Sequence, residues 1–212
     1  MNAMRAHIDL VADLHAPETT SLFEECIVLR EMPYVQDTAL DFGLQDPEQN
    51  SKKSQDLLRK DPTKLLNQDD YCLYRLGDQS GFFFMIDEKD GMIVYFIEFE
   101  QTDLSGFGTG VTQIKLWRAQ TLGFSGITKK VFFEYLLPEF GCVISDEAQT
   151  LDGKKFWTGA MGAAFRTGLT VGFYDHGAVS VCQGSYPLWL QQQDAWGNDL
   201  SYFQKRFFIK AH

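Results

Sequence analysis

The sequence has few of the features that commonly announce a function. Its 212 residues include four cysteines, none of which forms a Cys-x-x-Cys pair. Scattered cysteines inside apolar runs are typical of small buried side chains in a reducing compartment, so we expect a cytoplasmic protein without a disulfide framework. The four histidines share no ligand spacing and the cysteines do not cluster, which predicts that the chain has no metal site.

Positive charge and long apolar runs are also scarce. The chain carries 19 Lys and Arg residues against 29 Asp and Glu residues, a formal net charge of −10. Such a surface repels nucleic acids and anionic membranes, so neither is expected as a partner. The longest apolar runs, such as MIVYFIEF, have the length of a strand rather than of a membrane span. His7 and Asp9 interrupt the first apolar stretch, which argues against a signal peptide.

Several well-known motifs are missing as well. The chain has neither the G-x-G-x-x-G fingerprint of dinucleotide-binding folds nor the G-x-x-x-x-G-K-[ST] loop of nucleotide triphosphatases. It also lacks the G-x-S-x-G elbow of the serine hydrolases. His176 and Cys182 flank a short segment, but a histidine in a Asp-His-Gly turn is more often a surface residue than half of a catalytic pair.

The composition and the pattern of apolar runs predict an α+β fold. With 44% hydrophobic and 14% aromatic residues, the chain can fill the core of a domain of ordinary size. From Tyr71 onward, apolar and aromatic runs separated by Asp/Gly clusters are typical of an antiparallel meander. The expected order is strands at 71–76, 82–86, 92–100 and 110–118, a helix at 125–137 ended by Pro138, a strand at 142–145, a helix at 150–166, a hairpin at 169–184 and a C-terminal strand. This order predicts a single mixed, mostly antiparallel central sheet flanked by helices.

The residues before the meander differ in texture from the rest. We interpret residues 1–66 as an N-terminal extension of helix and loop, and residues 67–212 as the domain proper. An amphipathic helix is expected within 18–32, ending before Pro33. The polar stretch 45–56 is expected to be a mobile loop or the beginning of a short helix.

The most informative stretch is the turn Gln120-Thr-Leu-Gly123-Phe-Ser125-Gly126, between a predicted strand and a predicted helix. A helix N-terminus presents unpaired amide donors, and glycines let a ligand approach the backbone closely. Lys129 and Lys130 in the first turn add positive charge, so the turn suits a pyrophosphate. Glycines also serve tight strand-to-helix connections that bind nothing, and the turn alone does not separate the two interpretations.

The order of elements around this turn resembles that of the GNAT superfamily of acyl-coenzyme A-dependent N-acyltransferases. The signature of that family at this place is Q/R-x-x-G-x-G/A, and the chain has Gln120-Thr-Leu-Gly123-Phe-Ser125, with Ser125 as a mild departure. The stretch VISDEAQTLDGKKFW resembles a GNAT-like subgroup that is common in bacteriophages and mobile elements. The resemblance extends from about residue 70 to residue 185.

The resemblance implies a cofactor, acetyl-coenzyme A or another acyl-coenzyme A. Its pantetheine arm would follow strand 110–118, and its diphosphate would bind the amides at the turn, while strands 110–118 and 142–145 would splay apart around the thioester. The positions that the resemblance assigns to the cofactor are Ile114, Leu116, Gln120, Leu122, Gly123, Phe124, Ser125, Gly126 and Lys129. An amine of a small molecule or of a protein would then attack the thioester directly while a general base removes its proton.

The catalytic acid and base are harder to assign. Strand 110–118 has no carboxylate, so the resemblance leaves Glu98 and Glu100 on the neighbouring strand as candidate bases, although their alternation also fits a solvated strand face. Tyr174 is the candidate acid, and Asp146 either orients the acceptor or caps the next segment. Two functions therefore remain open: an N-acyltransferase, or an inactive GNAT-like protein, phage-encoded in this interpretation, that acts by binding a host or partner protein.

Overall fold

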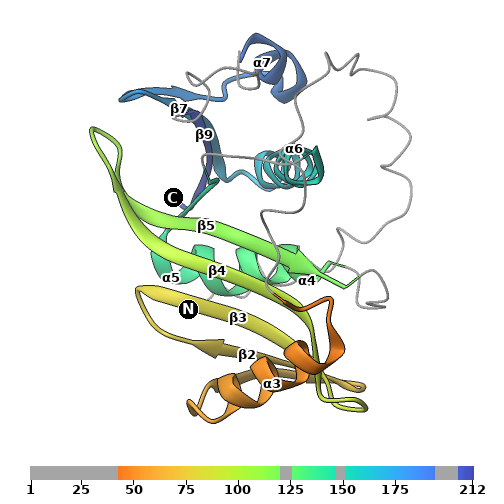
Figure 1. The fold of residues 1–212 in the computed structure, drawn as a ribbon. Coiled ribbons are helices and arrows are strands. Elements are labelled where there is room, and N and C mark those ends of the chain that lie inside the picture. The colour runs from red at the N-terminus through yellow and green to blue at the C-terminus, as the bar shows by residue number, and fades with distance from the viewer. Residues whose placement is uncertain (1–42, 120–125, 147–150, 194–204) are drawn as a thin grey trace, which may run out of the picture.

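A computed structural model describes residues 43–119, 126–146, 151–193 and 205–212, and places nine strands of these segments in one open sheet (Figure 1). Along the sheet the strands follow the order β1-β2-β3-β4-β5-β6-β9-β7-β8. Their bounds are β1 Thr63–Gln68, β2 Tyr71–Leu76, β3 Ser80–Asp87, β4 Met92–Leu104, β5 Gly108–Arg118, β6 Cys142–Ile144, β7 Thr170–Asp175, β8 Ala178–Val181 and β9 Lys205–Lys210.

The sheet is mixed and mostly antiparallel, as the sequence predicted. Strands β2 to β5 form the expected meander, and β7 and β8 form the expected hairpin. The pair β5–β6 is parallel, and every other neighbouring pair of the described sheet is antiparallel. The C-terminal strand β9 lies between β6 and β7, so the end of the chain joins two elements that precede it by many residues. The α+β class is therefore confirmed.

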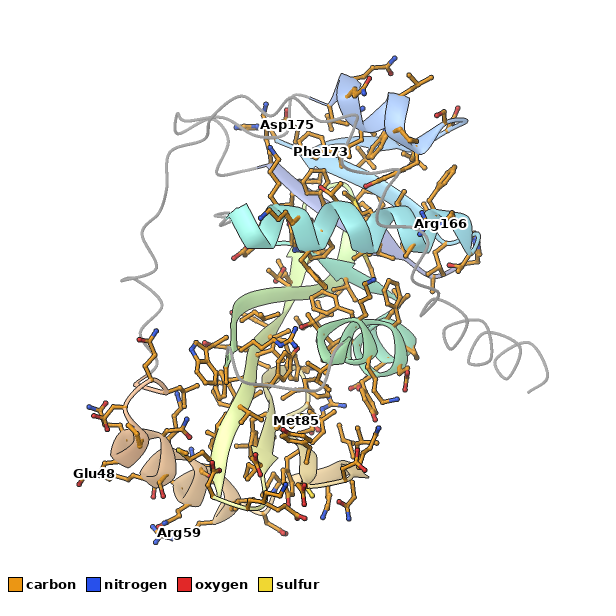
Figure 2. All side chains as sticks on the ribbon, turned by 90° about the vertical axis from the view of Figure 1, so that its right-hand side faces the viewer. Glu48, Arg59, Met85, Arg166, Phe173 and Asp175 are labelled. Carbon is orange, nitrogen blue, oxygen red and sulfur yellow. The ribbon has the colours of Figure 1, made fainter. Side chains whose placement is uncertain are left out.

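Both faces of the sheet are covered, because the central strands are apolar on both sides. On one face a large cluster, which includes Phe83, Met85 and Phe99, packs against the helices of the second half of the chain. On the other face, Phe84 and Phe96 belong to a smaller cluster that is completed by residues of helix α3 and its lead-in. Figure 2 shows α3, marked by Glu48 and Arg59, on the opposite side of these strands from the helix that follows β5.

Helix α3 spans Pro47–Leu58, where the sequence allowed either a mobile loop or the beginning of a short helix. Its start has a clear chemical cause: the Asp46 side chain accepts a hydrogen bond from the Gln49 amide at 2.9 Å, and Pro47 occupies the first turn. The helix is polar overall, and it is held by the buried side chains of Asn50, Ser54 and Leu57.

Strand β1 was not predicted. Its sequence, TKLLNQ, has two apolar residues side by side rather than in alternation, and its pairing with β2 is irregular between Lys64 and Leu66. An edge strand with one partner needs little apolar surface, so the pattern carries a weak signal. The predicted boundary at residue 66 falls inside β1, and the helix predicted within 18–32 lies outside the described residues.

The helix after β5 runs without a break through three segments, α4 Ile127–Lys130, the π-helix η4 Val131–Leu136 and α5 Leu137–Phe140. The prediction that Pro138 ends it is wrong, because the helix continues to Phe140 and ends at Gly141, which is left-handed (φ 70°). The Leu137 amide bonds to the Phe132 carbonyl, five residues back. A widened π turn directly before the proline accommodates the missing donor and the ring, which an ordinary α-helix tolerates poorly.

Helix α6 spans Leu151–Arg166 and packs on the large cluster with the face that the sequence predicted. Trp157, Ala160, Met161 and Ala164 are buried there, and Phe156 and Phe165 pack at its edges. A short helix that was not predicted, α7 Tyr186–Gln192, adds buried Tyr186 and Trp189. Figure 1 shows α6 and α7 over the end of the sheet formed by β7 and β9, far from α3.

Candidate functional site

Strands β5 and β6 meet over a very short distance and then part. Their pairing consists of Val111 with Val143 and Thr112 with Ile144. Where the pair begins, the strands touch closely, since a Cβ added to Gly110 would lie 2.7 Å from Ile144 Cδ1. Beyond Thr112, β5 continues for six residues to Arg118, whereas β6 ends at Ile144.

After Ile144 the chain follows β9 and not β5. The Ser145 amide donates to the Phe207 carbonyl at 2.8 Å, and the Ser145 hydroxyl accepts from the Phe207 amide at 3.0 Å. Ser145 is fully buried, so both bonds lie in the interior, where they hold this part of the chain firmly to β9. We call the place where β5 and β6 part, after Thr112 and Ile144, the fork.

A β-bulge in β5 lies at the fork. In the pairing with β4, Glu98 faces Lys115 and Phe99 faces Gln113, so Ile114 is an extra residue without a counterpart on β4. A bulge bends its strand and increases the local twist. The bend therefore falls directly after the last residue pair that β5 shares with β6. The backbone at Ile114 and Leu116, which the sequence assigned to a cofactor, lies in this bent part of β5.

The helix that follows β5 begins at Gly126, which is left-handed (φ 81°) and gives no side-chain cap. Gly126 therefore gives the first amides of α4 no side-chain acceptor of the kind that Ser, Thr, Asp or Asn supplies at many helix starts. Lys129 is exposed in this first turn, and Lys130 forms an ion pair with Glu134 one turn later. The other predicted turn positions, Gln120, Leu122, Gly123, Phe124 and Ser125, lie outside the described residues.

Strand β5, the helix 127–140 and strand β6 form a β-α-β unit, and helix α6 follows it. Because β5 and β6 are parallel, their C-terminal ends lie at the same end of the sheet. The helix 127–140 begins soon after the end of β5, and helix α6 begins soon after the end of β6. The two helices touch: the rings of Phe132 and Trp157 pack edge-on with centroids 5.5 Å apart. The fork, the start of α4 and the first turns of α6 therefore lie at one end of the sheet.

Glu98 and Glu100 share one face of β4, as their alternation predicted. Their neighbours Ile97 and Phe99 are buried in the large cluster on the opposite face. Glu100 is exposed and lies across from Thr112, the last residue of β5 that pairs with β6. Glu98 is half-buried and lies across from Lys115. Of the two carboxylates, Glu100 is therefore the one whose strand position is level with the fork.

Tyr174 lies on β7, and three strands separate it from β4. At about 4.8 Å per strand, that places the two strands roughly 19 Å apart. The Tyr174 hydroxyl donates to the Ser105 carbonyl at 3.4 Å, and its ring packs edge-on against Phe107. The structure therefore does not bring Tyr174 together with Glu98 or Glu100.

Asp146 directly follows the last residue that β9 holds. It is half-buried, and its carbonyl accepts a hydrogen bond from the Ser145 hydroxyl at 3.2 Å. This position is beyond the C-terminal end of β6, on the side where the two helices start. Asp146, which the sequence predicted to orient the acceptor or to cap the next segment, therefore lies two residues after Ile144, the last residue of β6 that pairs with β5.

Polar residues on the buried face of α6 were missed by the sequence analysis. Lys154 is 7% exposed, and its burial lowers the pKa of its ammonium group. Thr158 follows one helical turn later and is also buried. The signal was present in the sequence, because a lysine and a threonine four residues apart share one side of a helix. Apolar neighbours on that side made the face resemble ordinary core.

Neither a metal site, a membrane-spanning helix nor a family relationship is found for the described residues. No group of three or more His, Cys, Asp or Glu side chains in the described ranges is placed to hold a metal ion. None of the described helices has the length and apolar character needed to cross a membrane. No protein-family model matches the chain, and no curated protein sequence matches it.

Proposed function

We propose that the chain has a GNAT-like domain and is an N-acyltransferase that transfers an acyl group, in the first instance acetyl, from acyl-coenzyme A to an amine. The observation that carries the proposal is the fork: a parallel pair limited to two residue pairs, followed at once by a bulge at Ile114. A site of this kind exposes the backbone of one strand to a ligand, because the neighbouring strand has turned away. The sequence resemblance requires parted strands at this place.

In the proposed complex, each part of the cofactor has a counterpart at this end of the sheet. The pantetheine arm bonds to backbone groups of β5 at Ile114 and Leu116, beyond the last residue paired with β6. The diphosphate binds the turn from Gln120 to Gly126, at the uncapped start of the helix, with Lys129 nearby. Unpaired amides and the helix dipole favour an anion there.

The proposed reaction needs one proton acceptor. The amine nitrogen attacks the thioester carbonyl carbon, the C–N bond forms, and the C–S bond breaks to release the coenzyme A thiolate. The proton lost by the amine goes to a carboxylate, and Glu100 is the candidate whose strand position is level with Thr112 and the fork. The thiolate takes a proton from water, since Tyr174 is bonded elsewhere. The acceptor is an amine-bearing small molecule or a protein.

The alternative is a GNAT-like protein that has lost its chemistry and binds a host or partner protein. The separation of Tyr174 from both glutamates favours it, because three strands lie between the candidate acid and the candidate bases. Exposed apolar side chains also occur in this part of the chain, Val179 and Val181 on β8 and Leu188 on α7. Exposed apolar side chains are a common feature of protein-binding surfaces.

Thermal unfolding with and without acetyl-coenzyme A separates the two functions. A ligand that binds the folded state alone raises the midpoint temperature by mass action, so an acyltransferase is stabilised by millimolar acetyl-coenzyme A. An unchanged midpoint at that concentration favours the partner-binding alternative. Release of free thiol with a panel of amines then tests for turnover.

The variant Gly123→Asp tests where the cofactor binds. It places a carboxylate where the proposal puts the diphosphate, so the stabilisation by acetyl-coenzyme A is expected to disappear. Lys52→Glu is the matched control, because it makes a charge change at an exposed position of α3, a helix that contributes nothing to the proposed site. A Gly123→Asp protein that acetyl-coenzyme A still stabilises fully would show that the turn is not the diphosphate site.

A further inference from the structure

Strand β8 forms one end of the sheet, and its outer side is uncharged. Among the described residues, β7 is the only strand that pairs with it. Its sequence, AVSV, contains neither a charged residue nor a proline, and its register with β7 is regular. Edge strands in natural proteins usually carry charges, prolines or bulges, because an open row of backbone groups otherwise pairs with another chain.

Strand β1, at the other end of the sheet, has two of these protective devices. Lys64 lies within the strand and forms an ion pair with Glu88, with 3.5 Å between Nζ and Oε1. The register with β2 shifts between Lys64 and Leu66, so Leu65 has no counterpart there. A charge and a bulge both hinder the addition of a strand. Of the two ends of the described sheet, β8 is therefore the one suited to a further strand.

The hydrogen-bond pattern shows which backbone groups of β8 point away from β7. The Cys182 amide donates to the Val171 carbonyl at 2.9 Å, in the register that β8 and β7 share. Hydrogen-bonded and non-hydrogen-bonded pairs alternate along an antiparallel ladder, so Ser180 also bonds to β7. The amides and carbonyls of Val179 and Val181 therefore point to the outer side of β8.

The same two residues have exposed apolar side chains. Val179 is 41% exposed and Val181 is 42% exposed. The Ser180 side chain points to the opposite face, where its hydroxyl accepts a hydrogen bond from the Trp189 indole of α7 at 3.2 Å. A strand added to β8 would therefore bond to the outward backbone groups and cover the two valines on one face.

We propose that β8 pairs antiparallel with β8 of a second copy of this chain, so that one sheet continues through a two-fold symmetric dimer. The two-fold axis passes beside Ser180, and Val179 of each copy exchanges its backbone hydrogen bonds with Val181 of the other copy. A register centred on Val179 or on Val181 would instead pair the strand with residues beyond its ends, Gly177 or Gln183.

Self-complementarity favours a second copy as the partner. Closed two-fold dimers are the commonest assemblies of soluble proteins, and they need a surface that is complementary to itself. The outward groups of β8 meet this need, because Val179 and Val181 lie symmetrically on either side of Ser180.

The charges around β8 also permit two copies to approach. Each chain has a formal net charge of −10, so most of its surface repels another copy. In the register centred on Ser180, Asp175 and His176 of one copy face the uncharged residues Ser185 and Gly184 of the other. No like charges therefore meet along the paired strands. The inference does not depend on the acyltransferase proposal, because β9 and β7 lie between β8 and the fork.

Sedimentation equilibrium of the full chain tests the proposal. A pair of strands of four residues is a small interface, so a monomer is expected at about 1 µM and a dimer at about 500 µM. Val179→Lys/Val181→Lys places lysine opposite lysine across the axis and is expected to raise the dissociation constant of the dimer at least about tenfold. Val179→Lys/Val181→Glu places each lysine opposite a glutamate, so its constant is expected to stay within about threefold of the unmodified value.

Thr63→Lys/Gln68→Lys is the matched control, because it adds the same charge at exposed positions of β1, the other edge strand. It is expected to leave the dissociation constant unchanged. Thermal unfolding at about 1 µM checks that each variant folds, and its midpoint temperature is expected to stay within about 3 °C of the unmodified protein, because all four positions are exposed.

Three results would overturn the proposal. A chain that stays monomeric at the highest concentration does not pair with itself, and β8 would then be left to a different partner. A dimer that survives Val179→Lys/Val181→Lys unchanged has its interface elsewhere. Loss of the dimer in the lysine–glutamate variant as well would contradict the pairing of Val179 with Val181 across the axis. Binding of acetyl-coenzyme A is measured separately, so the proposed function stands or falls independently of these results.

Discussion

At the scale of single residues, the Asn50 amide joins helix α3 to the sheet. Its Nδ2 donates to the carbonyls of Leu44 and Ile93, both at 2.9 Å, and its Oδ1 accepts from the Ile93 amide at 2.7 Å. The side chain thus bonds both the amide and the carbonyl of Ile93. Ile93 directly precedes a β-bulge at Val94, which has no counterpart on β3. A polar helix with few apolar residues can pack here because one buried amide fixes its place.

Asn50→Ala is expected to lower the free energy of unfolding by roughly 2–4 kcal/mol, because it leaves buried groups of Ile93 and Leu44 without partners. The better helix propensity of alanine offsets about 0.5 kcal/mol of that loss. Urea denaturation measures the change. Lys52→Ala, at an exposed position of the same helix, is the control and should stay within about 0.5 kcal/mol. A similar small change in Asn50→Ala would show that the amide contributes little.

Residue alternation was enough to predict some features of the site and not others. It placed Glu98 and Glu100 on one face of β4, because side chains of a strand alternate whatever the strand pairs with. It gave no sign that Tyr174 bonds to the Ser105 carbonyl, since that contact joins residues 69 positions apart. It gave equally little sign that β8 lies at an end of the sheet, because alternation does not say which strands are neighbours.

At the scale of elements, close contacts between strands explain a glycine in the middle of β7. A Cβ on Gly172 would lie 2.1 Å from Phe208 Cζ and 2.7 Å from the Ser180 carbonyl oxygen. Gly172 is paired with Phe208 on β9 and with Val181 on β8. The absent side chain lets the Phe208 ring lie across the strand, where it packs against Phe107 with centroids 4.5 Å apart.

Gly172→Ala is expected to destabilise the protein by about 1–3 kcal/mol, because a backbone oxygen and a buried ring must both move to admit the methyl group. Gly159→Ala is the matched control, since Gly159 lies inside α6 and a Cβ there meets nothing within 4 Å. That control is expected to raise the free energy of unfolding by up to about 1 kcal/mol through helix propensity. Equal effects of the two variants would contradict the account.

The ends of helices could be predicted from the sequence only where neighbouring residues determine them. The start of α3 lies where Asp46 and Pro47 stand, both of which favour a helix start. The end of the helix after β5 was misplaced because Pro138 usually stops a helix, whereas a π turn before it permits two further residues. That turn depends on packing against the sheet, which no local pattern encodes.

At the scale of the whole molecule, strand order was the least predictable feature. The sequence identified the runs that become β2 to β9, because each has its own apolar pattern. The insertion of β9 between β6 and β7 pairs residues 205–210 with residues that lie at least 30 positions earlier in the chain. Long-range pairing of this kind is decided by which edges stay open after the helices have packed, and the local pattern does not record it.

The large buried core also gives the molecule a predictable response to alkali. Burial raises the pKa of several thiols and phenols, those of Cys72, Cys142, Cys182, Tyr74, Tyr95, Tyr135 and Tyr186. In the unfolded chain these groups lose their protons at ordinary pH values, near 9.0 for a thiol and 10.0 for a phenol. The unfolded state therefore binds fewer protons above pH 9, and the free energy of unfolding must fall as pH rises.

Cys142 isolates one part of this response. Cys142 is 2% exposed, and burial raises the pKa of its thiol from 9.0 to about 12. The contribution of this protonated thiol to the free energy of unfolding is therefore complete below pH 9 and is lost between pH 9 and 12. Urea denaturation from pH 8 to pH 11 is expected to show a smaller decline in Cys142→Ala than in the unmodified protein, by about 2 kcal/mol at the upper end. The alanine removes packing at every pH, which shifts the curve without changing its slope. Two parallel curves would mean that the Cys142 thiol ionises as readily in the folded protein as in the unfolded chain, and that water reaches the side of the sheet on which Cys142 packs against Phe208 and Tyr174.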